Sequence, residues 1–336
     1  MGGAVAPAVT VSLVTRDGMA WLPRCIDSLA AQADVDVELL VIDNGSSDGT
    51  AGWLADRLAG SPGAQLDLRP GNTGYAPAHD AHILRARTPF VLLLNQDIEL
   101  DPDFLATALG VLRARPGVAS VQSLVTRLGP DGARSTTIDT TGLEMHRDRR
   151  VVSRDQGRNL AAANRPAGPV WGADGPVPVY RRSALMAARL PGRTGWEVLD
   201  RDFFAYKEDV DLAWRLRRLG WDAWYEPRAR AWHARGASVS ATPGRQGIRR
   251  AAAAPEAVRL LSWRNQHLMQ LKNDPWQDVL RDLPWIARRE VLSLGLLLLG
   301  GPGRIRALFD LARHLPWAAR KRRALQRAVR RAVPRA

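Results

Sequence analysis

The chain has 336 residues, of which 46% are hydrophobic and 24% are charged. This composition supports a large buried core and excludes a protein that is disordered or fibrous along its whole length. Lysine and arginine outnumber aspartate and glutamate by 48 to 34, which gives a net charge of +14. Residues 301–336 contain eleven arginines and lysines and one aspartate, so +10 of this charge lies at the C-terminal end.

Cysteine content and hydropathy bear on the cellular compartment. Cys25 is the single cysteine, which excludes an internal disulfide and a cysteine-based zinc site and favours a reducing environment. Residues 1–8 lack the basic stretch of a secretory signal. The longest uncharged apolar stretch, residues 291–300, is shorter than the roughly 18 residues that a transmembrane helix needs. We therefore expect a cytoplasmic protein without a signal peptide or a membrane-spanning helix.

The first 125 residues alternate short β-branched apolar runs with segments of helical periodicity. This alternation is typical of βαβ units around a parallel sheet, and it predicts an α/β fold. The expected strands cover residues 9–14, 37–42, 65–68 and 90–94. The expected helices cover residues 21–32, 50–58, 75–87 and 101–115.

Polar side chains directly follow two of these strands. Asp43-Asn44 comes after the second strand and Asn95-Gln96-Asp97 after the fourth. In open α/β sheets such positions face the ligand-binding crevice. Asp43 there can accept hydrogen bonds from a nucleoside, although capping of the next helix explains it equally well. Asp97 can bind a divalent cation together with substrate phosphates.

The loop after the first strand argues against one class of enzyme. Residues 15–18 read Thr-Arg-Asp-Gly, so the glycine fingerprint of dinucleotide-binding folds is absent at this point. A nicotinamide-dependent enzyme is therefore disfavoured.

The second half of the chain is less regular until residue 256. Residues 126–168 are polar and basic, and we expect loops and a hairpin there. The next expected elements are a strand at 170–179 that runs into a helix, a helix at 208–219, short strands at 224–225 and 229–232, and a mobile loop at 237–255. Beyond that loop the pattern is wholly helical.

A third acidic group stands at the start of the expected helix 208–219. Glu208, Asp209 and Asp211 lie within four residues, and the helix dipole by itself favours carboxylates there. The preceding residues 203–206 (FFAY) are mostly aromatic and would exclude water from Glu208-Asp209. Such surroundings raise a carboxylate pKa toward the range in which a general base works.

Together these motifs resemble the inverting family-2 glycosyltransferases of the GT-A fold, and in particular bacterial rhamnosyltransferase-like members. The resemblance covers roughly residues 9–240 and rests on the order of seven motifs. They are residues 11–16 (VSLVTR), 40–50 (LVIDNGSSDGT), 72–76 (NTGYA), 92–97 (LLLNQD), 171–173 (WGA) before Arg181-Arg182, 203–212 (FFAYKEDVDL) and 232–233 (WH). The resemblance implies a Rossmann-like mixed sheet flanked by helices in residues 1–250, followed by a basic amphipathic helical region at 251–336.

The resemblance also implies roles for individual residues. The expected residues around the nucleotide-sugar donor are Thr15, Arg16, Asp43, Asn44, Asn72, Gly74, Tyr75, Asn95 and Gln96. Asp97 matches the last carboxylate of the family's D-x-D motif, and His233 matches a histidine that binds the metal or the diphosphate, so Mg²⁺ or Mn²⁺ is the expected cofactor. A packed core histidine is the alternative for His233.

The implied chemistry centres on Asp209, which matches the catalytic base. Glu208 beside it would contact the acceptor, as would Trp171 and Gly172. Two departures from the family pattern stand out. Residues 172–176 (GADGP) replace the usual Gly-Ala and apolar strand, and Gln96 takes a place often held by proline.

The resulting functional expectation is a sugar transfer with inversion, in the synthesis of cell-envelope glycans. The donor would be deoxythymidine diphosphate rhamnose, with a UDP-hexose or a galactofuranose donor as alternatives. The acceptor would be a glycan or a polyprenyl-linked sugar. A non-catalytic nucleotide-sugar or carbohydrate binding protein is the alternative of another class.

The basic C-terminal region has its own expectation. Arginines alternate there with Leu, Ile and Trp, as in helices that lie on membranes. We expect residues 285–331 to dock the protein on the anionic inner face of the plasma membrane, without specific nucleic-acid binding.

Overall fold

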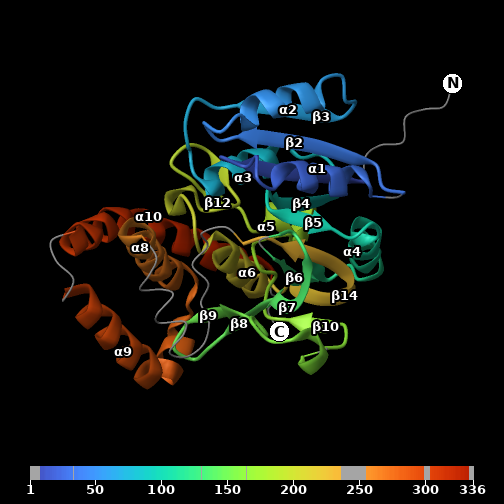
Figure 1. Ribbon diagram of the computed structural model, residues 1–336. Coiled ribbons are helices and arrows are strands. Elements are labelled where there is room, and N and C mark those ends of the chain that lie inside the picture. The colour runs from blue at the N-terminus through green and yellow to red at the C-terminus, as the bar shows by residue number, and fades with distance from the viewer. Residues whose placement is uncertain are drawn as a thin grey trace.

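The computed structural model describes residues 8–32, 34–129, 131–163, 165–235, 255–298 and 303–332. A large mixed sheet carries helices on both faces, and three long C-terminal helices lie beside it (Figure 1). The strands are β1 (Val9–Thr15), β2 (Val37–Asp43), β3 (Ala64–Leu68), β4 (Phe90–Asn95), β5 (Ile98–Leu100), β6 (Val118–Leu128), β7 (Arg134–Thr140), β8 (Leu143–Met145), β9 (Val151–Ser153), β10 (Gly168–Val170), β11 (Val179–Arg181), β12 (Leu190–Pro191), β13 (Trp196–Glu197) and β14 (Asp222–His233). The helices are α1 (Leu22–Ala30), α2 (Thr50–Leu58), α3 (Tyr75–Arg85), α4 (Phe104–Ala114), η1 (Leu160–Ala162), α5 (Arg182–Ala187), η2 (Arg201–Phe203), α6 (Glu208–Arg218), α8 (Glu256–Asn273), α9 (Trp276–Leu298) and α10 (Gly303–Ala332).

The order of the strands places the ends of β1, β2 and β4 together. The main sheet runs β10-β14-β6-β11-β4-β1-β2-β3, with β5 paired to β14 and β7 to β6. β1 pairs in parallel with β2 on one side and β4 on the other, whereas β11 is antiparallel to both β4 and β6. The chain therefore reverses its direction of strand addition between β1 and β4, where open α/β sheets bind ligands.

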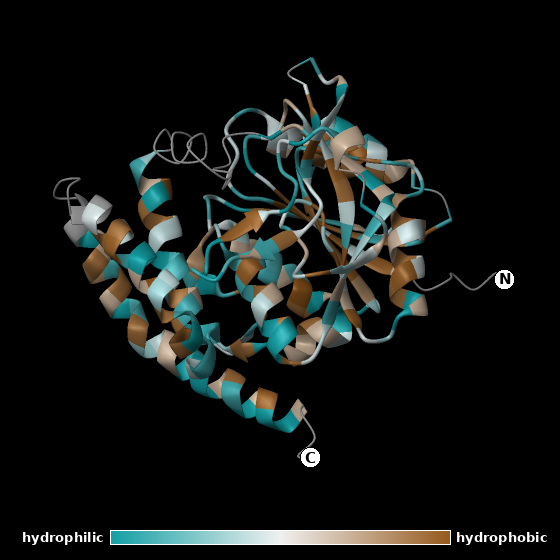
Figure 2. Ribbon diagram, turned by 90° about the horizontal axis from the view of Figure 1, so that it is seen from below, coloured by the Kyte–Doolittle hydropathy of each residue, from teal (hydrophilic) through white to brown (hydrophobic). Residues whose placement is uncertain are grey.

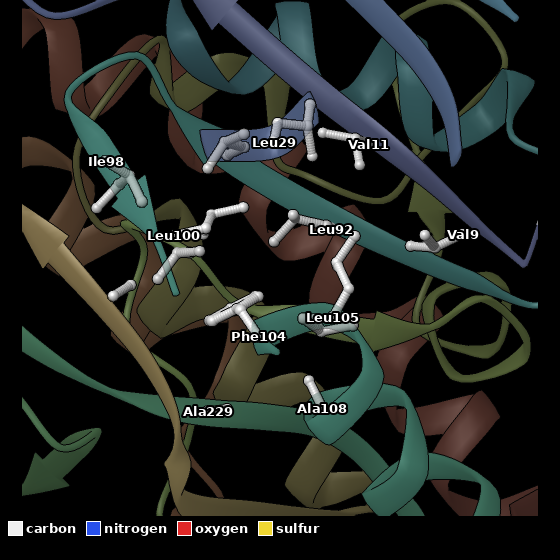
Figure 3. Packing of buried hydrophobic residues seen from close by; sticks show 14 of the residues in the cluster. Val9, Val11, Leu29, Leu92, Ile98, Leu100, Phe104, Leu105, Ala108 and Ala229 are labelled. Carbon is white, nitrogen blue, oxygen red and sulfur yellow. The ribbon is translucent and has the colours of Figure 1, made fainter. Parts of the chain in front are cut away.

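Alternation along the strands assigns the helices to two faces. In β1, Val9, Val11 and Leu13 pack with α1 and α4 on one face, and Figure 3 shows Val9 and Val11 near Leu92 and Leu105. The β4 residues Val91 and Leu93 face the other way, toward α3, α5 and α6. Figure 2 shows apolar strands in the interior and mixed colouring along the outer helices. The predicted α/β fold is thereby confirmed.

The second half departs from the sequence-based expectation in three places. The strand expected at 170–179 is instead two short strands, β10 and β11, separated by residues 171–178. Residues 126–168 hold all of β7, β8 and β9 and the end of β6, an eleven-residue strand; β8 and β9 form the expected hairpin, but the strands take the place of many of the expected loops. The sequence of β6, VASVQSLVTRL, mixes Ser, Gln and Thr into a strand that is buried on both faces, so its polarity hid the pattern. The two short strands expected at 224–232 form one strand, β14, interrupted by a register shift between Glu226 and Arg230. Most of the expected mobile loop and the expected boundary at residue 250 lie outside the described residues.

The C-terminal helices share a core with the rest of the chain. Leu268 and Met269 of α8 and Ala318 of α10 pack with Phe203 and Val210. The expectation of an exposed basic surface is wrong for Lys321 of α10, which is 1% exposed. Its ammonium group lies within 2.9 Å of the carboxylates of Glu197, Asp200 and Asp202, because a buried cation must be paired. In the part of the chain that the structure describes, no helix has the length and apolar character to cross a bilayer.

Candidate active site

A cleft of about 560 Å³ opens at the carboxyl ends of β1, β2 and β4. Seven of the nine predicted donor residues line it, together with the predicted metal residue. These lining residues are Thr15, Arg16, Asn44, Asn72, Tyr75, Asn95, Gln96 and Asp97. The remaining wall comes from Val14, from Phe204, Ala205 and Tyr206, and from Ala257, Val258 and Leu261 of α8.

The two predicted donor residues that do not line the cleft support it from behind. Asp43 is buried and accepts hydrogen bonds from the backbone N–H, at 3.1 Å, and the hydroxyl of Ser46. These bonds stay within the loop before α2 and do not cap that helix, whose N-cap residue is Gly49, so the capping alternative does not describe Asp43. Gly74 has φ of +96°, and a Cβ at this position would lie 2.6 Å from the Phe204 ring, so only glycine fits this close approach.

Asn44 and Asn72 form one amide network at the bottom of the cleft. The Asn44 Nδ2 donates to Asn72 Oδ1 at 3.0 Å, and Asn44 Oδ1 accepts from the Thr73 N–H at 2.9 Å. Asn72 Oδ1 also accepts from the Gly74 N–H at 2.9 Å. The network fixes the loop between β3 and α3 against the end of β2, and this rigid backbone forms one wall of the cleft.

Gln96 ties the ends of β1 and β4 together. Its Oε1 accepts from the Thr15 hydroxyl at 2.5 Å and from the Arg16 N–H at 2.8 Å, and its Nε2 donates to the Arg16 carbonyl at 3.2 Å. A proline could make none of these three bonds, since it has no side-chain polar atom. The departure from the family pattern at this position thus has a structural consequence.

Asp97 and His233 come together at the edge of the cleft, as predicted. His233 Nε2 lies 3.2 Å from Asp97 Oδ2, and Nδ1 lies 2.8 Å from Asp139 Oδ2. Burial opposes the charged imidazole, but the two carboxylates outweigh it and raise the pKa of His233 to about 9. Asp139, which no sequence signal singled out, also pairs with Arg235.

Asp97 and His233 fit as ligands of a divalent cation that the substrate helps to bind. Within the described residues no group of three His, Cys, Asp or Glu side chains is arranged to hold a metal ion, so the protein offers two ligands, Asp97 and His233. Mg²⁺ and Mn²⁺ sites often combine one or two protein ligands with substrate phosphates and water. Asp139 on the far ring nitrogen is the kind of partner that orients a metal-binding histidine.

The predicted base lies at the start of α6, next to the cleft but outside its lining. Burial raises the pKa of Asp209 to about 6, and the nearby carboxylate of Asp174 adds to the effect. Burial and the Asp209 charge raise the pKa of Glu208 to about 8. Two neighbouring carboxyl groups whose pKa values are raised by different surroundings can take different roles as acid and base.

Hydrogen bonds connect Asp209 to the cleft. Its Oδ2 accepts from the Gly175 N–H at 3.0 Å. The Tyr75 hydroxyl lies 3.3 Å from the Gly175 carbonyl and 2.9 Å from Asn95 Oδ1. The unusual residues 172–176 therefore position the base, because Gly175 supplies the backbone group that holds it.

The loop before α6 separates the aromatic residues that were expected to exclude water together. Phe203 is fully buried in the core, whereas Phe204 and Tyr206 line the cleft. Glu208 is buried beside them, and its Oε2 has no hydrogen-bond partner among the described residues. Glu208 is thus shielded from water, whereas Asp209 is partly exposed.

Two of the three predicted acceptor residues, Trp171 and Gly172, pack against α6 instead of lining the cleft. The Trp171 ring contacts the Trp214 ring edge-on, with centroids 6.3 Å apart. A Cβ on Gly172 would lie 2.5 Å from the Ala213 Cβ, so α6 requires a glycine there. Their contact with an acceptor stays a prediction.

Sequence reasoning missed the contribution of α8 to the cleft. Ala257, Val258 and Leu261 belong to the region that was interpreted as an appendage. Their apolar spacing is that of any amphipathic helix, so no signal in the sequence distinguishes a cleft wall from a core face.

Comparisons with known proteins agree with this architecture. A family model described as Glycosyl transferase family 2 matches residues 10–186, just over half of the chain. N-acetylglucosaminyl-diphospho-decaprenol L-rhamnosyltransferase of Mycobacterium tuberculosis is 28% identical over 249 residues, which cover 66% of this chain and 74% of that protein. Chondroitin synthase of Pasteurella multocida is 26% identical over 127 residues, 38% of this chain but only 13% of the synthase.

Solved structures are similar at the level of the fold. Residues 1–349 of S. aureus TarS in complex with UDP align with a TM-score of 0.54 and 14% identity, covering 96% of this chain and 87% of that one. GalNAc-T7 with UDP, GalNAc and Mn²⁺ aligns with a TM-score of 0.59 and 12% identity, covering 79% and 48%. With the nucleotide-sized cleft, the carboxylates and the matched family model in agreement, this chain belongs to glycosyl transferase family 2 and has the GT-A fold.

Proposed function

We propose that this glycosyltransferase moves L-rhamnose, with inversion, from a nucleoside-diphosphate donor to a hydroxyl of a polyprenyl-linked glycan in cell-envelope synthesis. The observation that carries the proposal is the path Asn95–Tyr75–Gly175–Asp209, which connects the donor cleft to a carboxylate with a pKa raised to about 6. The name of the M. tuberculosis relative, a decaprenol-linked rhamnosyltransferase, supports both the sugar and the acceptor class.

The mechanism is a single displacement. The acceptor hydroxyl gives its proton to Asp209, its oxygen bonds to the anomeric carbon, and the bond from that carbon to the diphosphate breaks with its electrons on the leaving nucleotide. A positioned base of this kind typically contributes 10²–10⁴-fold to the rate. A divalent cation bound by Asp97 and His233 would supply positive charge to the departing diphosphate.

The apolar part of the cleft favours rhamnose over an ordinary hexose. Phe204 and the α8 residues Val258 and Leu261 offer no hydrogen bonds from their side chains. Rhamnose carries a methyl group where a hexose carries a hydroxymethyl group, and an apolar wall leaves that hydroxyl unpaired. We therefore place the sugar of the donor against this wall.

Calorimetry with a panel of nucleotide sugars tests the donor assignment. We expect deoxythymidine diphosphate rhamnose to bind more tightly than UDP-glucose or UDP-galactofuranose, and Mn²⁺ to strengthen binding. Leu261→Ser should reduce the preference for rhamnose, while Leu68→Ser, an exposed leucine of β3, is the matched control. If no nucleotide sugar binds, the enzyme proposal is wrong, and if UDP-hexose binds best, the rhamnose assignment is wrong.

We also propose that α9 brings the enzyme to the anionic inner face of the plasma membrane, where a polyprenyl-linked acceptor resides. Large apolar side chains recur on one face of α9 and are between 44% and 71% exposed. They are Trp276, Leu280, Leu283, Val291 and Leu294. The exposed Arg288 lies beside this stripe, and such an arginine favours anionic headgroups by about 1 kcal/mol. Arg281 also lies beside it but pairs with Asp278 and Asp282.

Sedimentation with vesicles of anionic and neutral phospholipid tests this docking. Leu280→Ser combined with Leu283→Ser should weaken binding, and Trp196→Ser, an exposed tryptophan of β13, should not. A charge swap belongs at the exposed Arg320, Arg323 and Arg327 of α10, since the adjacent Lys321 is buried. Unchanged binding of both variants, or a parent that prefers duplex DNA at equal ionic strength, would refute the membrane proposal.

A further inference from the structure

The loop between η2 and α6, residues 203–207, has an unusual backbone conformation. Phe204 has φ of +63° and ψ of −63°, and the Ala205 N–H donates to the Phe203 carbonyl at 2.7 Å, so the loop opens with a γ-turn. Tyr206 and Lys207 follow with φ of +71° and +73°. Non-glycine residues hold such conformations only when surrounding contacts impose them.

Asn265 of α8 supplies those contacts. Its side chain is 0% exposed, and its Nδ2 lies 2.9 Å from each of three carbonyl oxygens of the loop, on Phe203, Ala205 and Tyr206. Three converging carbonyls can only accept, so the amide nitrogen must face them. The two N–H groups of one side chain are thus shared among three backbone acceptors of the γ-turn and the residue after it.

Arg264 fixes the orientation of this amide. Its Nε and Nη2 donate to Asn265 Oδ1 at 3.1 and 2.9 Å. Its Nη2 also donates to the Asp202 carbonyl at 2.6 Å, and its Nη1 pairs with Asp310 of α10 at 2.7 Å. A guanidinium group only donates, so the amide cannot flip without losing bonds on both of its ends.

The loop connects the cleft expected to bind the donor with the carboxylates at the start of α6. On the donor side, the Phe204 carbonyl accepts from the Ala76 N–H at 2.9 Å, and the Phe204 ring covers Gly74. On the other side, Lys207 leads directly into Glu208-Asp209 at the start of α6. The conformation of residues 203–207 therefore sets where Asp209 lies relative to the cleft.

We propose that Asn265, oriented by Arg264, is a positioning residue that holds the loop in the conformation that presents Asp209 to the acceptor. The proposal rests on the proposed function in one respect, the role of Asp209 as base. It makes the C-terminal helices part of the catalytic apparatus, since α8 and α10 both act on this loop. Asn265 itself touches no reacting atom.

Adjacent Gln266 provides a matched control. It is 3% exposed on the same helix, and its Nε2 donates to the Arg149 carbonyl at 3.0 Å, away from the loop. Asn265→Asp and Gln266→Glu each replace an amide by an isosteric carboxyl and remove the donors. Asn265→Asp keeps the acceptor that Arg264 uses, but it replaces the donor to the loop by an oxygen that the three carbonyls repel.

The experiment compares these variants of the full chain by turnover, nucleoside-diphosphate affinity and melting temperature. We expect Asn265→Asp to lower kcat at least 10-fold with diphosphate affinity within 3-fold, and Gln266→Glu to keep kcat within 3-fold at a similar or larger loss of melting temperature. Asn265→Ala and Gln266→Ala form the second pair if a carboxyl variant fails to fold. Equal kcat losses in the two variants of a pair would overturn the proposal.

A double variant separates this inference from the proposed function. If Asn265 acts through Asp209, adding Asn265→Asp to Asp209→Asn should leave the residual single-turnover rate unchanged. Multiplied losses would show that Asn265 acts on something other than the base and would overturn the inference. Full activity of Asp209→Asn alone would instead refute the assignment of the base, and with it both proposals.

Discussion

The donor side and the base side of the cleft are built in opposite ways. On the donor side, Asn44, Asn72 and Gln96 bond to loops that follow neighbouring parallel strands. On the base side, the loop at 203–207 is held by Asn265, about 60 residues further along the chain. The donor side therefore depends on strand order, which the sheet imposes, whereas the base side depends on the docking of the C-terminal helices.

Removing the proposed base should give the largest difference between the two sides, because it should lower the transfer rate and leave donor affinity nearly unchanged. Asp209→Asn should lower the transfer rate by about 10²–10⁴-fold, because a neutral amide cannot accept the acceptor proton. Donor affinity should stay within a few-fold, since Asp209 does not line the cleft. Rates with a polyprenyl-linked acceptor and calorimetry with the donor measure the two effects.

The neighbouring carboxyl groups serve as controls for that variant. Glu208→Gln should reduce transfer less, because burial and the Asp209 charge raise the pKa of Glu208 and favour its neutral form, which a glutamine resembles. Asp211 pairs with Lys272 and Arg215, so Asp211→Asn should chiefly lower stability. If Asp209→Asn keeps full activity and Glu208→Gln or Asp211→Asn loses transfer activity, the base is Glu208 or Asp211 instead of Asp209.

The next largest effect should be a loss of stability when the contacts that anchor the C-terminal helices are removed. Lys321→Met removes the buried cation that Glu197, Asp200 and Asp202 share, and breaking buried pairs of this kind typically costs about 3–5 kcal/mol. Asp200 keeps its pair with Lys272, and Asp202 keeps its pair with Arg193. Arg320→Met, at an exposed neighbour that stacks on Trp317, should lose less than about 1 kcal/mol. Urea unfolding followed by far-UV circular dichroism measures both.

Turnover and nucleoside-diphosphate affinity of the same two variants show whether α10 supports the base side in particular. If α10 supports the base side, Lys321→Met should lower turnover more than nucleoside-diphosphate affinity at a temperature where the variant is folded. An equal loss of both, or a stability equal to that of Arg320→Met, would show that the helices are not coupled to the base side in particular.

A smaller effect, on Mn²⁺-dependent donor binding, is expected from changes around Asp97 and His233. Asp97→Ala should abolish the Mn²⁺-dependent part of donor affinity. Asp139→Asn should weaken Mn²⁺ binding by about 10–100-fold, the usual effect of removing the partner of a metal-binding histidine. Asp67→Asn, an exposed carboxylate of β3, is the control. Full Mn²⁺ dependence in Asp97→Ala would show that this carboxylate is structural.

The same contrast explains what the sequence could and could not predict. β1, β2 and β4 were predicted to within one residue because a short apolar run ending in polar residues is a local pattern. Asn44, Asn95 and Gln96 line the cleft for the same reason. Thr15, Arg16, Asn72 and Tyr75 also line it, but they were expected from the family resemblance and not from this pattern. Asn265 and Asp139 escaped prediction because their meaning lies in contacts with residues far along the chain, and a lone buried Asn or Asp leaves no periodic signal.

The finest test concerns the pH dependence of transfer, because it isolates the surroundings of one carboxylate. A base must be deprotonated, so kcat should fall as the pH drops below about 6, the pKa to which burial and Asp174 raise Asp209. With an exposed aspartate as base, the enzyme would keep its activity down to about pH 4.

The variant Asp174→Asn tests this explanation. It is isosteric and retains an oxygen for the Gly175 N–H, yet it removes the charge that disfavours ionised Asp209. The acid limb of the kcat profile should therefore move to lower pH, whereas Asp278→Asn, at an ion pair on α9, should leave it in place. A limb that does not move in Asp174→Asn, or that moves to higher pH, would contradict the assignment of Asp209 as the titrating base.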